Sequence, residues 1–311
     1  MASSALRLGK LLHSSFTFVS THIAAIAIGV AIFGIVNTAV KVATLKTIAP
    51  MVITTMTGQE MSMEKLQELQ VRAEAGEEAA QMELMAMAEQ FSGNMGENML
   101  KHLPRIVLMV VALALVSTLL IFAANGYFIN LALKPKTSMQ MLLWQGVKFI
   151  LPLFGITLWT FVRSYIWIPV VTFVLLLILL AVSAPEMATS VAGPLAIGMV
   201  LAVIVLSIIF YPRFALAPVI YLQDRKGVIA SVQKSLKETT GYWAKIVGNL
   251  LVVGIGGAVL LGIAAGVVQG IAWPLSPVSM LVSDLLQFAF MGFQIVFLVK
   301  LAQTIREHPI S

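Results

Sequence analysis

Residues 106–129 read IVLMVVALALVSTLLIFAANGYFI, and none of these side chains carries a charge. A transmembrane helix needs about 20 consecutive apolar residues, whereas the strands of a membrane barrel alternate apolar and polar residues over about ten positions. Residues 107–120 lack that alternation, so the stretch predicts a membrane-spanning helix. The whole chain has the same character, because 59% of its 311 residues are hydrophobic and 11% are charged, whereas soluble domains carry about a quarter charged residues.

Repetition of such stretches predicts an all-α, polytopic transmembrane helix bundle with six spans. The six cover residues 16–40, 106–129, 165–184, 191–211, 246–270 and 278–301. A seventh is the alternative at residues 149–162, but Lys148, Pro152 and Gly155 interrupt that region. Its 14 residues are short for a crossing and favour an interfacial or re-entrant helix.

We expect three domains, at residues 1–42, 43–104 and 105–311. The first is a signal-anchor helix, because Arg7 and Lys10 precede an apolar run without a clear cleavage site. The last is the transmembrane bundle.

The middle domain is an acidic, methionine-rich lobe outside the membrane, since nine of the fourteen acidic residues lie between Glu60 and Glu97. Its pattern predicts one helix from a cap at Ser62 towards Gly76 and a second from Glu77 to Phe91. Such a lobe could bind a membrane or periplasmic protein partner. Its methionines suit core packing better than a copper site, so no metal is predicted.

The placement of basic residues predicts the orientation. Most lysines and arginines fall on the side of the N-terminus if there are six spans, which the positive-inside rule assigns to the cytoplasm. We therefore expect a bacterial inner membrane with a cytoplasmic N-terminus. An organelle membrane is the alternative, because the basic, acid-free start also fits a transit peptide.

The stretch at residues 213–243 reads RFALAPVIYLQDRKGVIASVQKSLKETTGYW, and residues 165–169 read YIWIP. This order, an apolar run ending in Pro218, a polar turn with Gly227 and then small residues before an aromatic pair, resembles the YciC-like membrane proteins. It is also similar to the membrane domain attached to some glycerophosphoryl diester phosphodiesterases. The resemblance covers roughly residues 134–301, with Val170 where those families have glycine. It implies a six-helix inner-membrane module and supplies no catalytic residue.

An amphipathic helix is predicted after Gly227, because Val228, Val232 and Leu236 recur every four residues. This pattern is typical of a helix at the membrane interface. Basic side chains there would meet the anionic headgroups of the bilayer, each contributing about 1 kcal/mol near the surface. The candidate headgroup contacts are Arg213, Arg225, Lys226, Lys234 and Lys237; plain anchoring of the topology is the alternative.

Small residues follow each other every four positions along the span at 246–270. They are Gly254, Ala258, Gly262, Gly266 and Gly270. Because such a face lets another helix approach closely, we expect it to pack within the bundle, with a homo-oligomer as the alternative.

The last span carries a polar stripe of Asp284, Gln287 and Gln294. Polar groups inside a membrane are costly and face the protein interior. The stripe predicts either hydrogen bonds between helices or the wall of a polar cavity.

Sequence motifs for enzyme chemistry are absent. The chain has no cysteine, no GxxxxGK[ST] loop, no HExxH and no GxSxG, and its four histidines are scattered. The basic residues are also too dispersed for a nucleic-acid surface. We therefore expect no catalytic residue, no cofactor and no nucleic-acid partner. The predicted function is a scaffold or interaction role in envelope or lipid homeostasis, with a small-solute or lipid transporter as the alternative.

Overall fold

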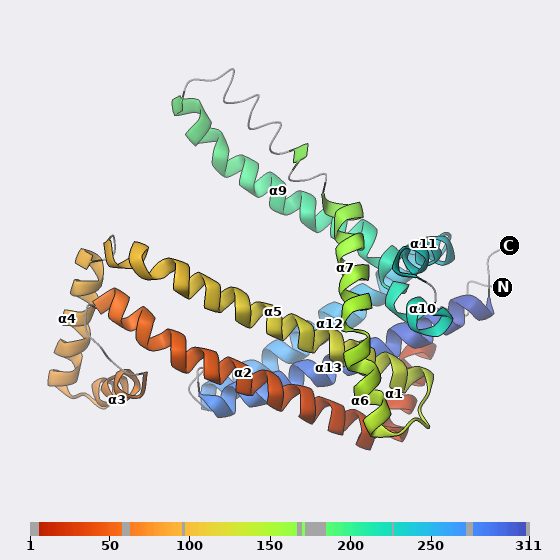
Figure 1. The fold of residues 1–311 in the computed structure, drawn as a ribbon, viewed down its shortest axis with the longest axis horizontal. Coiled ribbons are helices and arrows are strands. Elements are labelled where there is room, and N and C mark those ends of the chain that lie inside the picture. Colours follow the sequence, from red (N-terminus) through yellow and green to blue (C-terminus); the bar gives the residue numbers. More distant parts are fainter. Residues whose placement is uncertain are drawn as a thin grey trace. The chain divides into compact units, whose positions relative to one another are not determined.

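The computed structural model describes residues 6–57, 63–94, 97–166, 170–171, 185–225, 227–271 and 276–308. The chain is 91% helical and the described residues contain no strand, which confirms the all-α class. The helices are α1 (Leu8–Thr21), α2 (Ile23–Thr57), α3 (Met63–Glu74), α4 (Glu78–Asn94), α5 (Glu97–Leu133), α6 (Met139–Lys148), α7 (Ile150–Tyr165), α9 (Pro185–Phe214), α10 (Ala217–Asp224), α11 (Val228–Thr239), α12 (Trp243–Ile271) and α13 (Pro277–Glu307) (Figure 1).

Five helical stretches of the described chain are long and apolar enough to cross a membrane. They are Ile23–Ile48, Leu103–Leu133, Ile197–Asp224, Trp243–Val268 and Pro277–Glu307. A sixth is added if α6 and α7, which meet at an angle of 43°, form one bent span. The chain is therefore a multi-pass membrane protein. Most of the predicted span at 165–184 lies outside the described residues, so six and seven spans both stay open.

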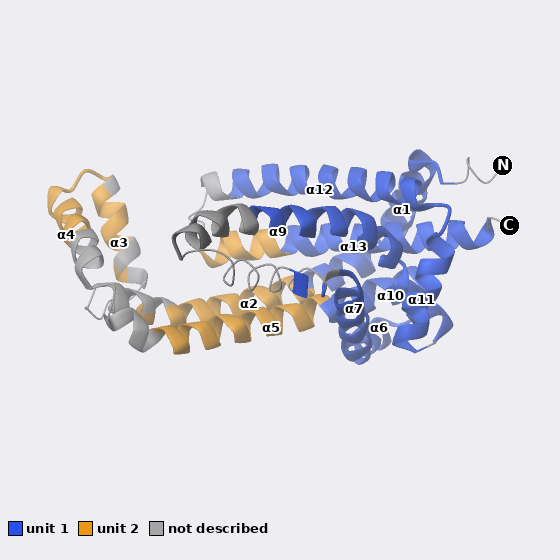
Figure 2. Ribbon diagram, turned by 90° about the horizontal axis from the view of Figure 1, so that it is seen from above, with its two compact units in different colours: residues 1–31, 122–271, 285–311 blue, residues 32–121, 272–284 orange. Residues whose placement is uncertain are grey.

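The helices form two compact units, coloured separately in Figure 2. Unit 1 comprises residues 1–31, 122–271 and 285–311, and unit 2 comprises residues 32–121 and 272–284. The domain boundaries expected after residues 42 and 104 fall inside α2 and α5, because both helices continue through those positions.

The N-terminal segment differs from the single helix predicted at 16–40. It forms a separate helix, α1, which ends where His22 donates its backbone N–H to the Phe18 carbonyl, and α2 starts at Ile23. Buried Leu11, Ser15 and Phe18 line one face of α1, the spacing expected of a helix packed along one side. The first span therefore begins at residue 23 instead of residue 16.

Close backbone packing positions the short helix α6 in unit 1. A Cβ atom at Gly146 would lie 2.6 Å from the carbonyl oxygen of Ala123, and one at Gly126 would lie 3.1 Å from the Cα of Gly146. Glycine at both positions lets α6 lie directly against α5. Phe149, the residue directly after α6, connects it to α7.

The core of unit 1 joins α5, α7, α9, α10 and α11. Its buried members are Phe122, Leu153, Ile156, Phe214, Ala217 and Val232. Val228 and Leu236 pack against the same cluster. The apolar stripe of α11 was predicted to face the membrane interface, but it packs against the protein core. Ser235 supports this packing by donating a hydrogen bond of 2.7 Å to the carbonyl oxygen of Arg213.

In unit 2, the two helices predicted for the acidic lobe are present as α3 and α4, which form a hairpin. Gly76 turns the chain between them with a φ of +88°, a conformation that glycine adopts without strain. Leu69 and Ala80 are buried between the two helices. Arg72 donates hydrogen bonds of 2.7 and 2.5 Å to Glu77, and this contact lowers the pKa of the Glu77 carboxyl. The hairpin is shorter than the lobe expected at 43–104, because α2 continues to Thr57 and α5 begins at Glu97.

Candidate functional site

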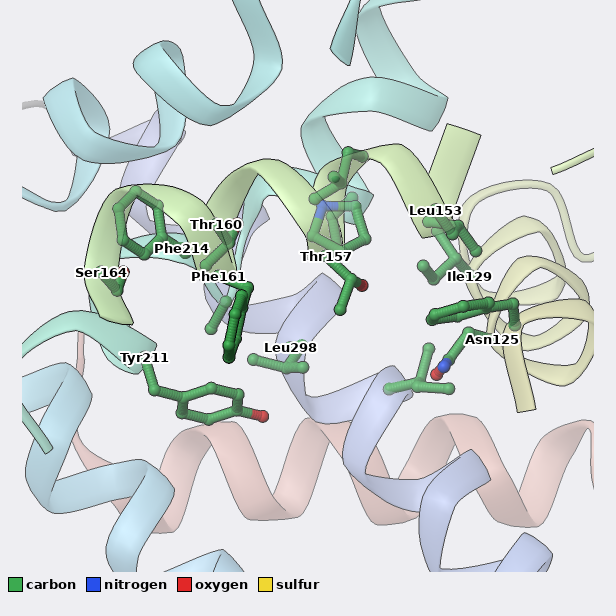
Figure 3. A pocket seen from close by; sticks show the side chains of 16 residues that line it. Asn125, Ile129, Leu153, Thr157, Thr160, Phe161, Ser164, Tyr211, Phe214 and Leu298 are labelled. Carbon is green, nitrogen blue, oxygen red and sulfur yellow. The ribbon is translucent and has the colours of Figure 1, made fainter. Parts of the chain in front are cut away.

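A cavity of about 340 Å³ opens beside α7 in unit 1 (Figure 3). Residues from α5, α7, α9, α10 and α13 line it: Phe122, Asn125, Ile129, Leu153, Ile156, Thr157, Thr160, Phe161, Ser164, Tyr211, Phe214, Ala215, Pro218, Val219, Ile295 and Leu298. Its inner wall is the packed core described above, since Phe122, Leu153, Ile156 and Phe214 belong to both. We call it the α7 pocket.

The α7 pocket is apolar with a few uncharged polar groups. The polar side chains are Asn125, Thr157, Thr160, Ser164 and Tyr211, and the described residues of the lining include no acidic, basic or histidine side chain. In Figure 3 the amide of Asn125 and the hydroxyls of Thr157 and Tyr211 surround the same space. This composition is typical of small-molecule sites, in which a few polar groups orient an otherwise apolar ligand.

Two hydroxyls of the pocket have no hydrogen-bond partner among the described residues. They are Oγ1 of Thr160 and Oγ of Ser164, both buried, four residues apart on one side of α7. A buried hydroxyl in a helix ordinarily donates to the carbonyl four residues earlier, as Ser15 does to Leu11 at 2.7 Å. An unpaired one costs about 1–3 kcal/mol. The two hydroxyls therefore favour a ligand that supplies a hydrogen-bond acceptor.

The pocket is open at one side in the described part of the chain. Phe161 is 52% exposed and Tyr211 is 57% exposed, although both contribute to the lining. Since both belong to apolar helices of a membrane protein, a ligand could enter from the surroundings of the bundle without passing through the packed core.

The predicted polar stripe of α13 separates into three different environments. Asp284 is buried, Gln287 is exposed and Gln294 is half-buried. The α13 residues that line the α7 pocket among the described residues are Ile295 and Leu298. Of the two interpretations of the stripe, hydrogen bonding between helices describes Asp284.

Asp284 is the acceptor in a buried cluster within unit 2. Asn37 Nδ2 donates to Oδ1 at 3.0 Å, Thr38 Oγ1 donates to Oδ2 at 2.8 Å, and Lys41 Nζ lies 2.5 Å from Oδ1. Asp284 is 1% exposed, whereas the Lys41 side chain is 35% exposed. The cluster joins α2 to α13 and neutralises a carboxylate that would otherwise be very costly in a membrane.

The candidate headgroup contacts are also in different environments. Lys234 is half-buried and lies 2.5 Å from Asp224 and 3.5 Å from Glu238, and Arg306 binds the same two carboxylates at 3.2 Å. Two cations and two anions thus form a neutral network that ties α13 to α10 and α11. Arg213, Arg225 and Lys237 are exposed; Lys226 lies outside the described residues.

The small face of α12 is not where this helix packs in the described structure. A Cβ atom at Gly254, Gly262 or Gly266 would meet nothing within 4 Å among the described residues, and Ala258 is exposed. The close approach occurs at Gly257 instead, directly against the ring of Phe290 on α13. The surroundings of Gly270 fall outside the described part. The homo-oligomer stays a prediction.

Sequence reasoning missed the residues that define the pocket and the buried cluster. Thr160 and Ser164 are two hydroxyl residues one helical turn apart in an apolar helix, a spacing that marks one face. Asn37, Thr38 and Lys41 form a similar polar patch in the first span. Both patterns are visible in the sequence, but their partners lie on other helices.

Comparisons of the chain with protein-family models, with curated proteins and with solved structures find no match. The resemblance to YciC-like proteins stays a prediction, and the site is interpreted from its own geometry.

Proposed function

We propose that this protein is a non-enzymatic membrane protein that binds an acyl-chain lipid in the α7 pocket, in a role in envelope or lipid homeostasis. The observation that carries the proposal is the pair of unpartnered hydroxyls, Thr160 and Ser164, in an apolar cavity. An ester carbonyl would accept their hydrogen bonds while the acyl chain covers the apolar wall. The cavity volume of about 340 Å³ lies within the usual range of ligand sites, about 300–1,000 Å³, and fits part of one chain.

Binding is favoured over catalysis by the chemistry of the lining. General acid–base catalysis needs a titratable group within hydrogen-bond reach of the reacting atoms, most often histidine or a carboxylate. The pocket offers hydroxyls and one amide, which orient a ligand. The proposal therefore requires no cofactor.

The proposed membrane is the bacterial inner membrane, with the N-terminus in the cytoplasm. Support comes from the distribution of lysine and arginine along the sequence, which the positive-inside rule relates to the cytoplasmic face. In this orientation the α3–α4 hairpin is on the periplasmic side, available to a membrane or periplasmic protein partner.

Transport is a second candidate, supported by the buried Asp284 cluster. Ionisable residues inside membrane helices commonly mark the pathway of a coupled ion or substrate, and the lysine that pairs with this carboxylate is 35% exposed. The lipid-binding role has the stronger support, because a cavity accompanies it.

Photo-crosslinking tests the proposal. The full-length protein in detergent is incubated with a diazirine-labelled monoacylglycerol, illuminated and digested. Labels are expected in α7 and α9 around the pocket. Ala215→Phe, which fills the cavity, should abolish them. The double variant Thr160→Val, Ser164→Ala should reduce binding about tenfold to thirtyfold, because it removes two hydrogen bonds of about 1 kcal/mol each.

The matched control is Ser207→Ala, at a half-buried serine of α9 that does not line the pocket and whose hydroxyl donates to the Val203 carbonyl. It should leave labelling unchanged. Equal labelling of the wild type and Ala215→Phe would refute the lipid site. The ligand-free double variant should be at least as stable as the wild type, since two unpaired hydroxyls are replaced by apolar groups; a loss of stability would show that these hydroxyls already have partners.

A further inference from the structure

A second pocket of unit 1, separate from the α7 pocket, lies where α6 meets the ends of α5 and α10. Its volume is about 380 Å³, and its lining is Asn130, Lys134, Met141, Trp144, Gln145, Lys148, Phe149, Tyr221, Leu222 and Arg225. We call it the basic pocket. It differs from the α7 pocket in kind, because three of the ten described residues that line it are cations.

The positive charge of the basic pocket is not neutralised by the described protein. The described residues of its lining include Lys134, Lys148 and Arg225 but no acidic residue. None of the three has a carboxylate within 4 Å in the described ranges. The adjacent carboxylate, Asp224, is already bound by Lys234 and Arg306. Three cations facing one cavity repel each other, so an anion in that cavity would be stabilised by all three.

The structure holds two of these cations at the pocket. Lys148 Nζ lies 5.1 Å from the centroid of the Trp144 ring, a cation–π distance. Arg225 caps α10 in the left-handed conformation with a φ of 51°, its backbone N–H donating to the Tyr221 carbonyl at 2.9 Å. Glycine is the usual residue at such a cap. Arginine at this strained position places a guanidinium beside the cavity.

An uncharged group adds a second requirement for the ligand. Oε1 of Gln145 is buried and accepts no hydrogen bond from the described residues. An amide oxygen needs a donor, which a phosphate diester cannot supply from its phosphate. A ligand that carries a hydroxyl group beside its phosphate would satisfy both the cations and Gln145.

We propose that the basic pocket binds a phosphate ester that also carries a hydroxyl group. Lysine and arginine are the usual phosphate ligands, and arginine binds two phosphate oxygens at once. The same chemistry is offered by the headgroup of an anionic phospholipid and by a free, water-soluble phosphate ester. The site is independent of the α7 pocket, so either proposal can fail alone.

Binding of dihexanoyl phosphatidylglycerol to the full-length protein in detergent tests this site. Lys134→Gln, Lys148→Gln and Arg225→Gln should each weaken binding about fivefold, the effect of one cation near a headgroup. Lys136→Gln is the matched control, because Lys136 is an exposed lysine two residues from Lys134 that does not line the pocket. It should change affinity less than twofold.

A variant of Gln145 tests the hydroxyl requirement. Gln145→Leu should weaken binding of phosphatidylglycerol, and it should leave unchanged the binding of dihexanoyl phosphatidylmethanol, an anionic diester without a headgroup hydroxyl. Lys148→Arg should keep the affinity within twofold. That variant, together with gel filtration of all ligand-free variants, separates loss of a charge from loss of the fold.

Competition with glycerol 3-phosphate distinguishes the two possible ligands, an anionic membrane phospholipid and a free, water-soluble phosphate ester. Displacement at similar concentration supports a free phosphate ester, and persistence of lipid binding in its excess supports a membrane lipid. Absence of saturable binding for both compounds would overturn the proposal. Equal weakening by Lys136→Gln and Lys134→Gln would also overturn it, because the attraction would then be that of a basic surface and not of the pocket.

Discussion

The buried contact between Lys41 and Asp284 gives the sharpest energetic prediction. Replacing Lys41 by methionine keeps an unbranched side chain but leaves the Asp284 carboxylate, 1% exposed, without a counter-charge. Breaking a buried ion pair costs about 3–5 kcal/mol. Because Lys41 is itself one-third exposed, part of the charge can be solvated, and we expect a loss of about 2–3 kcal/mol in the free energy of unfolding.

Removing both charges should cost little more than removing the carboxylate alone. Asp284→Leu leaves Asn37 and Thr38 without their acceptor, at about 1–3 kcal/mol for each donor before relaxation. The double variant Lys41→Met, Asp284→Leu has no carboxylate for a lysine to neutralise. The costs of the two single substitutions should therefore not add. The expected coupling energy between the two positions is about 2 kcal/mol.

Reversible unfolding in mixed detergent and sodium dodecyl sulfate micelles measures these values. The chain has no cysteine, so a fluorophore can be attached at one introduced thiol. Lys46→Met is the control, since Lys46 is an exposed lysine of the same helix and should lose less than about 0.5 kcal/mol. A Lys41→Met variant as stable as Lys46→Met, or additive costs in the double variant, would show that the contact contributes nothing.

Three further predictions concern other parts of the chain. Gly146→Ala should destabilise the protein by about 1–3 kcal/mol, because its Cβ would lie 2.6 Å from a carbonyl oxygen of α5; Gly262→Ala, with open space around it, should be neutral or stabilising in the same unfolding assay. The pKa of Glu77 is lowered by its hydrogen bonds to Arg72, so the stability it gives the hairpin is present above the ordinary glutamate pKa and is lost as pH falls through the lower, folded value. Spin labels on the exposed sides of α3 and α4 should report a broader distance distribution in acid, and a pH-independent distribution would contradict this. A cysteine in place of Lys237 should be protected from a membrane-impermeant thiol reagent in intact cells, and labelling there would reverse the proposed orientation.

Five of the six predicted spans, and the two helices of the hairpin, were predictable because their causes are local. An uncharged run of about 20 residues has few alternatives to a membrane helix, and Gly76 ends α3 by its own backbone preference. The ends of the helices were less predictable. α2 continues through Pro50 to Thr57, and α1 ends before His22 without a proline or glycine, so neither end follows the local signal.

The sites were not predictable because their residues come from distant parts of the chain. Asp284 was singled out as a costly polar residue, yet its partners lie 243 to 247 positions away. Lys234 looked like a free cation on a helix surface, and the carboxylates that bind it come from the end of α10 and its own next turn. Sequence shows which groups need partners, and only the fold shows which of them meet.

The Asp284 cluster also has a consequence for synthesis of the protein. Lys41 is in α2, and the carboxylate that it contacts is in α13, 243 residues later along the chain. At about 5–20 residues per second, α2 carries an uncompensated ammonium, an amide and a hydroxyl for roughly 12–50 s. During that interval α2 should stay beside the insertion machinery or near the headgroups, because its polar groups are paired only after α13 has been inserted.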